Sequence, residues 1–325
     1  MTTATRIDYA VLRRRPLARD AATTAYRLLN AEGDSVPNLT VDRYGPVAIV
    51  SAYDDLVFTG PRREEVIAAL MVVPGITAIY AKIRPKSAAR LSARETIALA
   101  PSSPVWGETR DDVAVKEHGL SYFIRPGKGL SAGLFLDMRE MRERVRTMAP
   151  HKTVLNLFAY TCAFGVAATA GGAARVLNLD AAKPALQWGQ ENYALNGFEA
   201  NPYDFVFGDV FDWLGRFAKR GTTFDLVIAD PPSFSTVSGS RFAASADYAA
   251  LAAACARVVG PGGLLLCCTN EAKLSSALFR QNCLDGVAEA GRDARILHEG
   301  GAPAMDFPTP PRQEGHLKLL LFVLD

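Results

Sequence analysis

The sequence lacks any hydrophobic run of the roughly 18 residues that a membrane-spanning helix needs. Its first residues, Met1 to Arg6, do not contain the apolar core of a secretory signal. Five cysteines form neither a CxxC pair nor a metal-ligand spacing, which favours reduced thiols over disulfides. These absences exclude a membrane protein and a disulfide scaffold, and they predict a cytoplasmic protein without a bound metal.

The sequence also lacks an internal repeat and a low-complexity tract. Its 325 residues are enough for two domains. The net charge of +2 hides an asymmetry. Residues 1–150 carry 22 Lys and Arg against 17 Asp and Glu, whereas residues 151–325 carry 14 against 17. Such a basic half fits phosphate binding, although a solvated helix face explains either basic cluster equally well. The clusters are Arg13 to Arg15 with Arg19, and Lys82, Arg84, Lys86, Arg90 and Arg94.

The first part of the chain is predicted to form a small α+β domain over residues 24–104, which would contact RNA if RNA is the substrate. An N-terminal extension (1–23) precedes it, and a hairpin or linker (105–130) follows. Gly and Pro punctuate its turns, and hydrophobic runs mark its strands. The expected elements are strands at 47–50 and 76–83, helices at 63–70 and around Arg90, and a hairpin at 113–123.

The second part, residues 131–325, alternates short apolar strands with helices. This alternation predicts an α/β fold with a doubly wound, mostly parallel, Rossmann-like sheet beside the smaller N-terminal α+β domain. The last apolar run, 317–323, is expected to be an antiparallel edge strand. The other expected strands are 153–157, 175–180, 205–207, 224–229 and 264–268, and the expected helices are 138–148, 163–170, 184–195 and 248–259.

An unusual elbow, Asp230-Pro231-Pro232, follows the strand 224–229. Each proline removes a backbone donor and fixes φ, so the pair makes a stiff turn with outward-pointing carbonyls. At the carboxyl end of a parallel strand, the carboxylate and carbonyl oxygens would face a ligand crevice. They suit an amino-bearing nucleobase edge, on which Phe234 could stack. The alternative is an ordinary strand-to-loop turn.

Polar residues also end three other strands, at Asn156, Asp180 and Asp209. Asp180 lies 24 residues after Asn156, about where dinucleotide-type folds place a ribose-binding carboxylate. The first loop lacks G-x-G-x-x-G and has Tyr160 and Thr161 where a pyrophosphate would need glycines. A nucleoside without phosphates fits better, with its ribose on Asp180, its adenine near Asp209 and a sulfonium tail by the first loop. That ligand is S-adenosylmethionine.

Several motifs are more specific than a general Rossmann pattern: Gly133–Arg139, Val154–Thr161, Asn192–Gly197 and Phe224–Ser235. Through them residues 131–274 closely resemble the large-subunit (23S) ribosomal RNA methyltransferases, a class I S-adenosylmethionine-dependent family. Residues 25–34 and 41–45 resemble the family's small central domain. Many members carry an N-terminal RNA-binding module of the PUA type, which is expected to be absent here because only about 24 residues precede the match.

The resemblance also implies roles for individual residues. Asn156, Phe158 and Tyr160 would line the methionine portion of the cofactor, and Cys162 stands where the family often has glycine, which could narrow the loop. The residues assigned to cofactor binding are Phe135, Asp137, Arg139, Asn156, Phe158, Tyr160, Thr161, Asp180, Asp209, Val210 and Asp230. The residues assigned to catalysis at the target base are Asp230, Pro231 and Phe234.

The family includes enzymes that methylate cytosine carbon-5 and enzymes that methylate guanine nitrogen-7. The two reactions need different catalytic residues. Carbon-5 needs a cysteine thiolate to add to the ring first, whereas a ring nitrogen already carries a lone pair and needs only alignment. By resemblance, the two positions that supply this cysteine correspond to Ser233 and Asn270, and neither holds sulfur. A register slip would place Cys268 there instead, and that alternative stays open.

The sequence therefore predicts an S-adenosylmethionine-dependent RNA base methyltransferase, acting on 23S ribosomal RNA at a purine nitrogen of the guanine-N7 kind. Three alternatives remain: a cytosine-C5 enzyme that uses Cys268, a methyltransferase for a small molecule or protein, and a non-catalytic RNA-binding assembly factor. The oligomeric state is open, with a homodimer as one option. The segment 304–316 is expected to be either an active-site cover or a structural loop.

Overall fold

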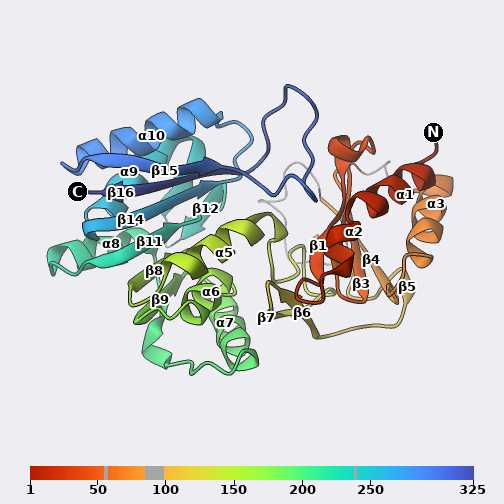
Figure 1. The fold of residues 1–325 in the computed structure, drawn as a ribbon, viewed down its shortest axis with the longest axis horizontal. Coiled ribbons are helices and arrows are strands. Elements are labelled where there is room, and N and C mark those ends of the chain that lie inside the picture. The colour runs from red at the N-terminus through yellow and green to blue at the C-terminus, as the bar shows by residue number, and fades with distance from the viewer. Residues whose placement is uncertain (55–57, 85–98, 238–239) are drawn as a thin grey trace. The chain divides into compact units, whose positions relative to one another are not determined.

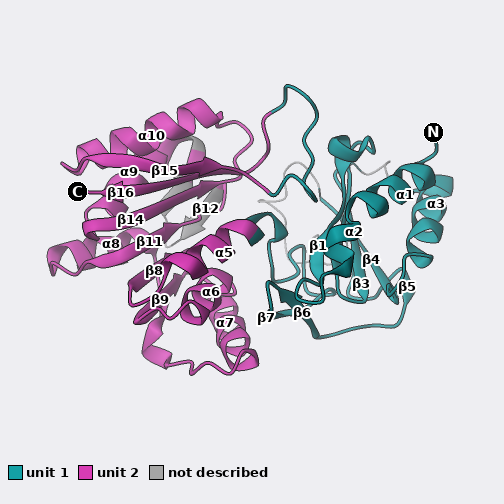
Figure 2. Cartoon of the chain, in the orientation of Figure 1, with its two compact units in different colours: residues 1–139, 303–313 teal, residues 140–302, 314–325 magenta. Residues whose placement is uncertain are grey.

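The computed structural model describes residues 1–54, 58–84, 99–237 and 240–325. The chain divides into two compact units, residues 1–139 with 303–313 and residues 140–302 with 314–325 (Figure 2). The contacts thus group residues 131–139 with the first unit. We still propose that the methyltransferase domain, as a unit that folds by itself, begins at residue 131.

The first unit is built on a five-stranded sheet in the order β1-β2-β3-β4-β5, in which β3 and β4 run parallel (Figure 1). The strands predicted at 47–50 and 76–83, the helix at 63–70 and the hairpin at 113–123 are present. The predicted helix around Arg90, with Lys86 and Arg94, lies outside the described residues. The elements are α1 (Thr3–Arg13), α2 (Arg15–Arg19), β1 (Ala25–Asn30), η1 (Ala31–Asp34), β2 (Leu39–Tyr44), β3 (Val47–Ala52), α3 (Gly60–Met71), β4 (Ala78–Ile83), β5 (Trp106–Gly107), β6 (Val113–Glu117), β7 (Leu120–Ile124) and η3 (Leu136–Met138).

The two faces of this sheet differ because strand side chains alternate. One face carries the hydrophobic core, in which α1 and α3 pack on the strands through residues such as Ile7 and Val66. The other face carries a buried polar row, Thr40, Ser51 and Lys82, on neighbouring strands. Burial and the nearby Arg84 guanidinium lower the pKa of Lys82 to about 7. No helix is predicted from the sequence before residue 24, yet α1 completes this core.

The segment 303–313 belongs to the first unit although it lies between two strands of the second in sequence. The carboxylate of Asp306 is fully buried. It accepts hydrogen bonds from both Nη atoms of Arg139, at 2.7 and 2.8 Å, and from the backbone N–H of Arg27 at 3.2 Å. Gly33 permits the close approach of this segment, since a Cβ there would lie 1.8 Å from the Pro308 oxygen. These contacts favour the structural-loop interpretation of residues 304–316.

The second unit contains a seven-stranded sheet in the order β10-β9-β8-β11-β14-β16-β15 (Figure 1). Its first five strands are parallel, which confirms the predicted doubly wound, mostly parallel fold class. The elements are α5 (Arg139–Met148), β8 (Thr153–Leu157), α6 (Ala163–Ala170), β9 (Arg175–Asp180), α7 (Lys183–Leu195), η4 (Pro202–Asp204), β10 (Phe205–Phe207), α8 (Val210–Lys219), β11 (Phe224–Ala229), β12 (Phe234–Val237), β13 (Ser240–Ala243), α9 (Ala244–Ala256), β14 (Val259–Thr269), α10 (Ser276–Glu289), β15 (Ala294–Gly300) and β16 (Lys318–Leu324).

Two sequence predictions for this unit were wrong. The last strand, β16, is antiparallel as expected but lies between β14 and β15, so β15 forms the edge. Its apolar run is buried on both faces, as an interior strand requires, while side chains of β15 are more exposed. The helix predicted at 248–259 ends at Ala256, and Val259 already begins β14 because β-branched residues favour strands.

Helices cover both faces of the second sheet (Figure 1). On one face α8, α9 and α10 contribute to a large core with Leu155, Val227 and Leu265. On the other, α6 and α7 pack against β8, β9 and β10. A sheet covered on both faces leaves the ends of its parallel strands as the place for a ligand.

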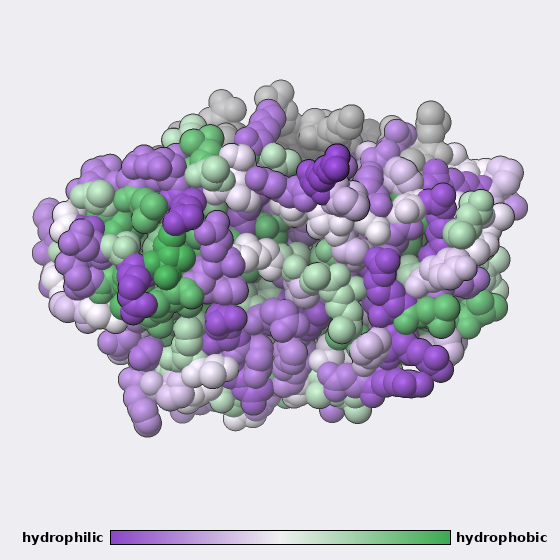
Figure 3. All heavy atoms as spheres, turned by 45° about the horizontal axis from the view of Figure 1, so that its top comes forward, coloured by the Kyte–Doolittle hydropathy of each residue, from purple (hydrophilic) through white to green (hydrophobic). Residues whose placement is uncertain are grey.

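The molecular surface is mixed in character. On the face shown in Figure 3, hydrophilic side chains cover most of the area and hydrophobic ones gather in patches between them. Within the described parts of the chain, no helix combines the length and the apolar character that crossing a bilayer requires.

Candidate functional site

The candidate site lies in the second unit, at the carboxyl ends of β8, β9, β10 and β11. These strands are neighbours and parallel, so their carboxyl ends meet at one edge of the sheet. The structure therefore brings Asn156, Asp180, Asp209 and Asp230 to a common edge, as the sequence predicts.

The loop after β8 has an unusual backbone. Phe158, Tyr160 and Cys162 have φ values of 54°, 48° and 59°, a left-handed conformation that is uncommon for residues other than glycine. Such conformations cluster at functional sites when surrounding structure holds them. Here the Tyr160 N–H donates to Asp180 Oδ2 at 2.7 Å, which ties the loop to the end of β9.

Cys162 occupies the position where the resemblance described above implies a glycine. Its left-handed φ explains why glycine suits the position. Its side chain is fully buried against Gly189 of α7, where an added Cβ would lie 2.3 Å from the sulfur. Burial raises the pKa of the thiol well above its ordinary value, so Cys162 acts as a packing residue.

Asp180 is oriented by backbone donors on both of its oxygens. Oδ2 accepts from Tyr160 and Oδ1 accepts from the Ala182 N–H at 2.7 Å. Partial burial raises the pKa of this carboxyl, and the backbone hydrogen bonds oppose the rise. Each oxygen keeps lone-pair capacity, so the pair can accept two adjacent hydroxyl groups such as those of a ribose.

Asn156 lies in a buried polar network beneath the loop. Its Nδ2 donates to Asn178 Oδ1 at 2.9 Å, and Asn178 in turn donates to the Tyr193 hydroxyl at 3.0 Å. The Oδ1 of Asn156 is buried without a hydrogen-bond partner among the described residues. A buried acceptor without a partner is costly, and a donor on a bound ligand would satisfy it.

Other predicted cofactor residues have evident structural roles. Asp209 caps α8, because its Oδ1 accepts the N–H groups of Phe211 and Asp212. Val210 is buried in the core of the second unit. Thr161 is also buried, and its carbonyl accepts from Asn192 Nδ2 at 3.0 Å. Their cofactor contacts stay predictions.

Three predicted cofactor residues belong to the first unit. Phe135 is half exposed. Burial lowers the pKa of the Arg27 guanidinium, but the charge and hydrogen bonds of Asp42 outweigh this and raise the pKa, and Asp137 adds a smaller contribution in the same direction. Arg139 is buried and paired with Asp306. The pairing gives the Arg139 side chain a structural role in addition to the one predicted.

The elbow after β11 is a rigid feature. Pro231 is buried and Asp230 is half-buried. The Tyr248 hydroxyl contacts the Ala229 carbonyl at 3.3 Å and the Cys268 carbonyl at 2.7 Å, so it links the ends of β11 and β14. The side chain of Phe234 lies outside the described residues.

A contact that the sequence did not predict joins Ser233 and Asn270. The Ser233 hydroxyl donates to Asn270 Oδ1 at 2.7 Å. Sequence reasoning named both positions as places for a cysteine, but only the pairing of β11 with β14 brings them together. In contrast, Cys268 is fully buried within β14.

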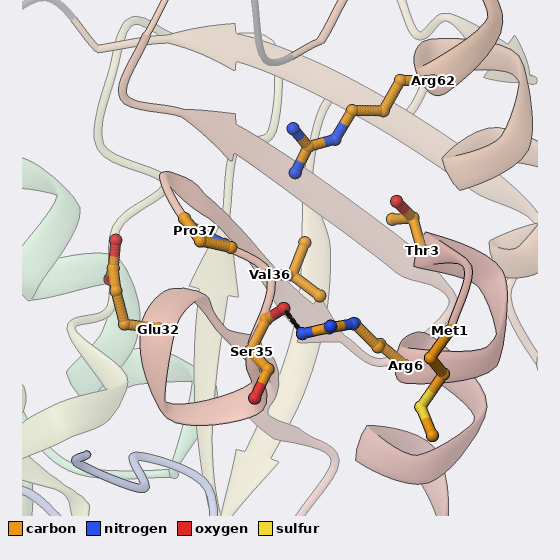
Figure 4. Close-up of a pocket in the computed structure, with 8 residues that line it drawn as sticks. All are labelled: Met1, Thr3, Arg6, Glu32, Ser35, Val36, Pro37 and Arg62. Carbon is orange, nitrogen blue, oxygen red and sulfur yellow. Dashed lines mark hydrogen bonds between the residues drawn. The ribbon is translucent and has the colours of Figure 1, made fainter.

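The first unit contains a basic cavity of about 410 Å³ that the sequence also did not predict (Figure 4). Arg62 of α3 extends into it, and Arg6 of α1 donates to the Ser35 carbonyl at its wall. The Nε atom of Arg62 is buried without a partner among the described residues. Two guanidinium groups against the single carboxylate of Glu32 make the cavity a candidate anion site.

S-adenosylmethionine fits the donor and acceptor groups at the strand ends. Asp180 offers acceptors for ribose hydroxyls, and the unsatisfied Asn156 Oδ1 offers an acceptor for an ammonium group. Within the described residues no cluster of side chains could hold a metal ion.

Comparison with known proteins agrees with this geometry. Residues 34–308 match the model of the S-adenosylmethionine-dependent methyltransferase family. A "Ribosomal RNA large subunit methyltransferase I" of Aeromonas salmonicida is 32% identical over 297 residues, 90% of this chain and 72% of that protein. A "Ribosomal RNA large subunit methyltransferase" of Deinococcus radiodurans is 34% identical over 300 residues, again 90% and 72%.

Solved structures give the same result. A crystal structure assigned as a methyltransferase and complexed with SAH, the demethylated cofactor, superposes with a TM-score of 0.88 at 30% identity, covering 98% of this chain and 80% of that chain. An S-adenosylmethionine-dependent methyltransferase structure from Streptococcus mutans gives 0.85 at 30% identity, covering 99% and 82%. The predicted resemblance, enzyme class and cofactor are confirmed. The chain belongs to the S-adenosylmethionine-dependent methyltransferase family.

Proposed function

We propose that this enzyme methylates a base of large-subunit (23S) ribosomal RNA at a purine nitrogen, of the guanine-N7 kind. The names of its relatives support the RNA substrate. We also propose that it works in the cytoplasm, in keeping with five buried cysteines that form no disulfide.

The observation that favours a ring nitrogen is the burial of every cysteine. A cytosine-C5 enzyme needs a thiolate that can reach the base. Cys268 is fully buried in β14, and the two positions that could supply a cysteine instead carry the hydroxyl of Ser233 and the amide of Asn270. A ring nitrogen needs only alignment with the methyl donor, for which proximity supplies much of the rate.

When bound, S-adenosylmethionine supplies an electrophilic methyl group. We propose that Asp180 holds its ribose, that Asn156 and the loop 158–162 hold its methionine portion, and that Asp209 and Val210 lie at the adenine. Asp230 and the Pro231 carbonyl would accept hydrogen bonds from the polar edge of the target base. The base must leave a helical stack to reach them, so we expect a loop or a flipped nucleotide as substrate.

The basic cavity of the first unit supports an RNA substrate. A phosphate could accept from Arg62, whose buried Nε has no other acceptor among the described residues. Arg6 lies in the same cavity wall and adds a second positive charge. We therefore propose that this unit contributes phosphate contacts, which position an RNA without recognising its sequence.

Transfer of labelled methyl groups to purified large-subunit RNA tests the proposal. The wild-type enzyme should label the RNA, and Asp230→Asn should lose nearly all transfer. The matched control is Asp285→Asn, an exposed position on α10 whose carboxylate accepts from Gln281 Nε2. Absence of labelling with the wild type, while a small molecule or protein accepts the methyl group, would contradict the proposal. Bound RNA without any turnover would indicate a non-catalytic assembly factor.

A further inference from the structure

The Ser233–Asn270 pair stands at the ends of two strands that form the proposed target-base site. Ala229 is level with Cys267 in the parallel pairing of β11 and β14, so Asp230 directly follows the last paired residue of β11. Asn270 lies three positions after Cys267 and directly follows the end of β14 at Thr269. Ser233 comes three positions after Asp230, beyond the two prolines. Ser233 is therefore next to the elbow in sequence, and its hydrogen bond brings Asn270 to the same place.

The turn that carries Asn270 is held by its own hydrogen bonds. The Glu271 N–H donates to Thr269 Oγ1 at 3.2 Å, and the Lys273 N–H donates to the Glu271 carboxylate at 2.9 Å. Lys318 Nζ donates to the Glu271 carbonyl at 3.0 Å. Asn270 is thus an exposed side chain on a fixed turn.

Ser233 is fixed from the other side. Its carbonyl accepts the N–H of Ala244 at the start of α9, at 3.1 Å. Both members of the pair therefore project from backbone that is hydrogen-bonded elsewhere in the unit. Preorganised polar groups of this kind discriminate between ligands better than mobile ones.

The hydrogen bond between the two side chains fixes which groups remain for a ligand. Asn270 Oδ1 carries no hydrogen, so the Ser233 hydroxyl must donate to it. The amide Nδ2 then keeps two donor hydrogens, and it has no hydrogen-bond partner among the described residues. The exposed pair therefore presents a donor at the same edge of the sheet as Asp230.

We propose that Asn270 is a specificity-determining residue that donates from Nδ2 to a carbonyl oxygen of the target base, with Ser233 as its positioning residue. This inference rests on the proposed function. Guanine has such an oxygen, O6, beside nitrogen-7, whereas adenine has an amino group there. The donor would therefore select guanine over adenine, and Asp230 would accept from the amino and imino groups of the same base.

Asn270→Asp tests the role because it keeps the size of the side chain and replaces the donor by an acceptor. We expect kcat/KM for RNA to fall about 100-fold, as for loss of a hydrogen bond that leaves a polar group unpaired. Ser233→Ala should cost about tenfold, since it removes only the orientation of the amide. Cofactor affinity and melting temperature should not change in either variant.

The control is Asn201→Asp, the same chemical change at an exposed residue that caps η4, where either residue is a good cap. A second measurement uses transcripts with guanosine or adenosine at the methylated position. The wild type should reject adenosine, and Asn270→Asp should lower the ratio of guanosine to adenosine activity. Unchanged activity and selectivity in Asn270→Asp would overturn the inference. Failure of the wild type to methylate any RNA would instead overturn the proposed function, so the two outcomes are distinct.

Discussion

The buried ion pair between Asp306 and Arg139 should be essential for the stability of the first unit. Asp306→Ala would leave the guanidinium of Arg139, which is only 1% exposed, without its bidentate carboxylate. Removing one partner of a buried pair costs about 3–5 kcal/mol. The Arg27 N–H would also lose its acceptor. We therefore expect a loss of about 3–5 kcal/mol in the free energy of unfolding of this unit.

The three tryptophans allow this unit to be observed separately. Trp106 lies in the first unit, and Trp188 and Trp213 lie in the second. In a background with phenylalanine at the latter two positions, fluorescence of Trp106 reports urea unfolding of the first unit. With a slope of about 2 kcal/mol per molar urea, the expected loss lowers the midpoint by about 1.5–2.5 M.

Two further variants make the experiment decisive. Asp112→Ala removes a half-exposed carboxylate that pairs with Arg125 in the same unit and should cost no more than about 1 kcal/mol. The double variant Asp306→Leu with Arg139→Met removes both charges and should recover much of the loss. A midpoint shift for Asp306→Ala no larger than that for Asp112→Ala would refute the reasoning.

Other predictions concern single side chains. Cys268→Ser should keep most methyl transfer in the labelling assay, whereas a dead variant with normal cofactor binding would restore the cytosine mechanism. Arg62→Gln should weaken RNA binding at low salt and reduce the slope of log K against log salt by about 1, and an unchanged slope would exclude a phosphate at this cavity. For Lys82, the folded pKa of about 7 lies below the unfolded 10.5, so the unfolded chain binds more protons between these values. The free energy of unfolding should therefore rise with pH from about 7 to 10.5, and Lys82→Met should flatten this rise in urea titrations at several pH values.

Much of the second unit follows from the sequence because its signals are local. Strands such as 153–157 and 175–180 are apolar runs bounded by turn residues, and their order predicts parallel pairing. The position of β16 was not predictable in the same way. A run such as Leu319 to Phe322 shows that a strand is buried but does not show which strand will flank it.

The sequence predicted those site residues that directly follow or end a parallel strand. Asn156, Asp180, Asp209 and Asp230 lie at one edge because parallel strands impose it. The Ser233–Asn270 contact depends on the register between β11 and β14, which no local pattern specifies.

Contacts distant in sequence were also missed. Arg139 and Asp306 are 167 positions apart, and nothing in either neighbourhood indicates the partner. The sequence contains only a weak indication of this pair. Asp306 is an acidic residue in an otherwise apolar segment, and a buried carboxylate needs a positively charged partner.

The most direct test of the central claim is nucleoside mass spectrometry of large-subunit ribosomal RNA from cells with and without this chain. We expect deletion to remove one methylated purine, of the 7-methylguanosine kind, and the wild-type gene to restore it while the Asp230→Asn form does not. Loss of 5-methylcytidine, or an unchanged set of modifications, would contradict it.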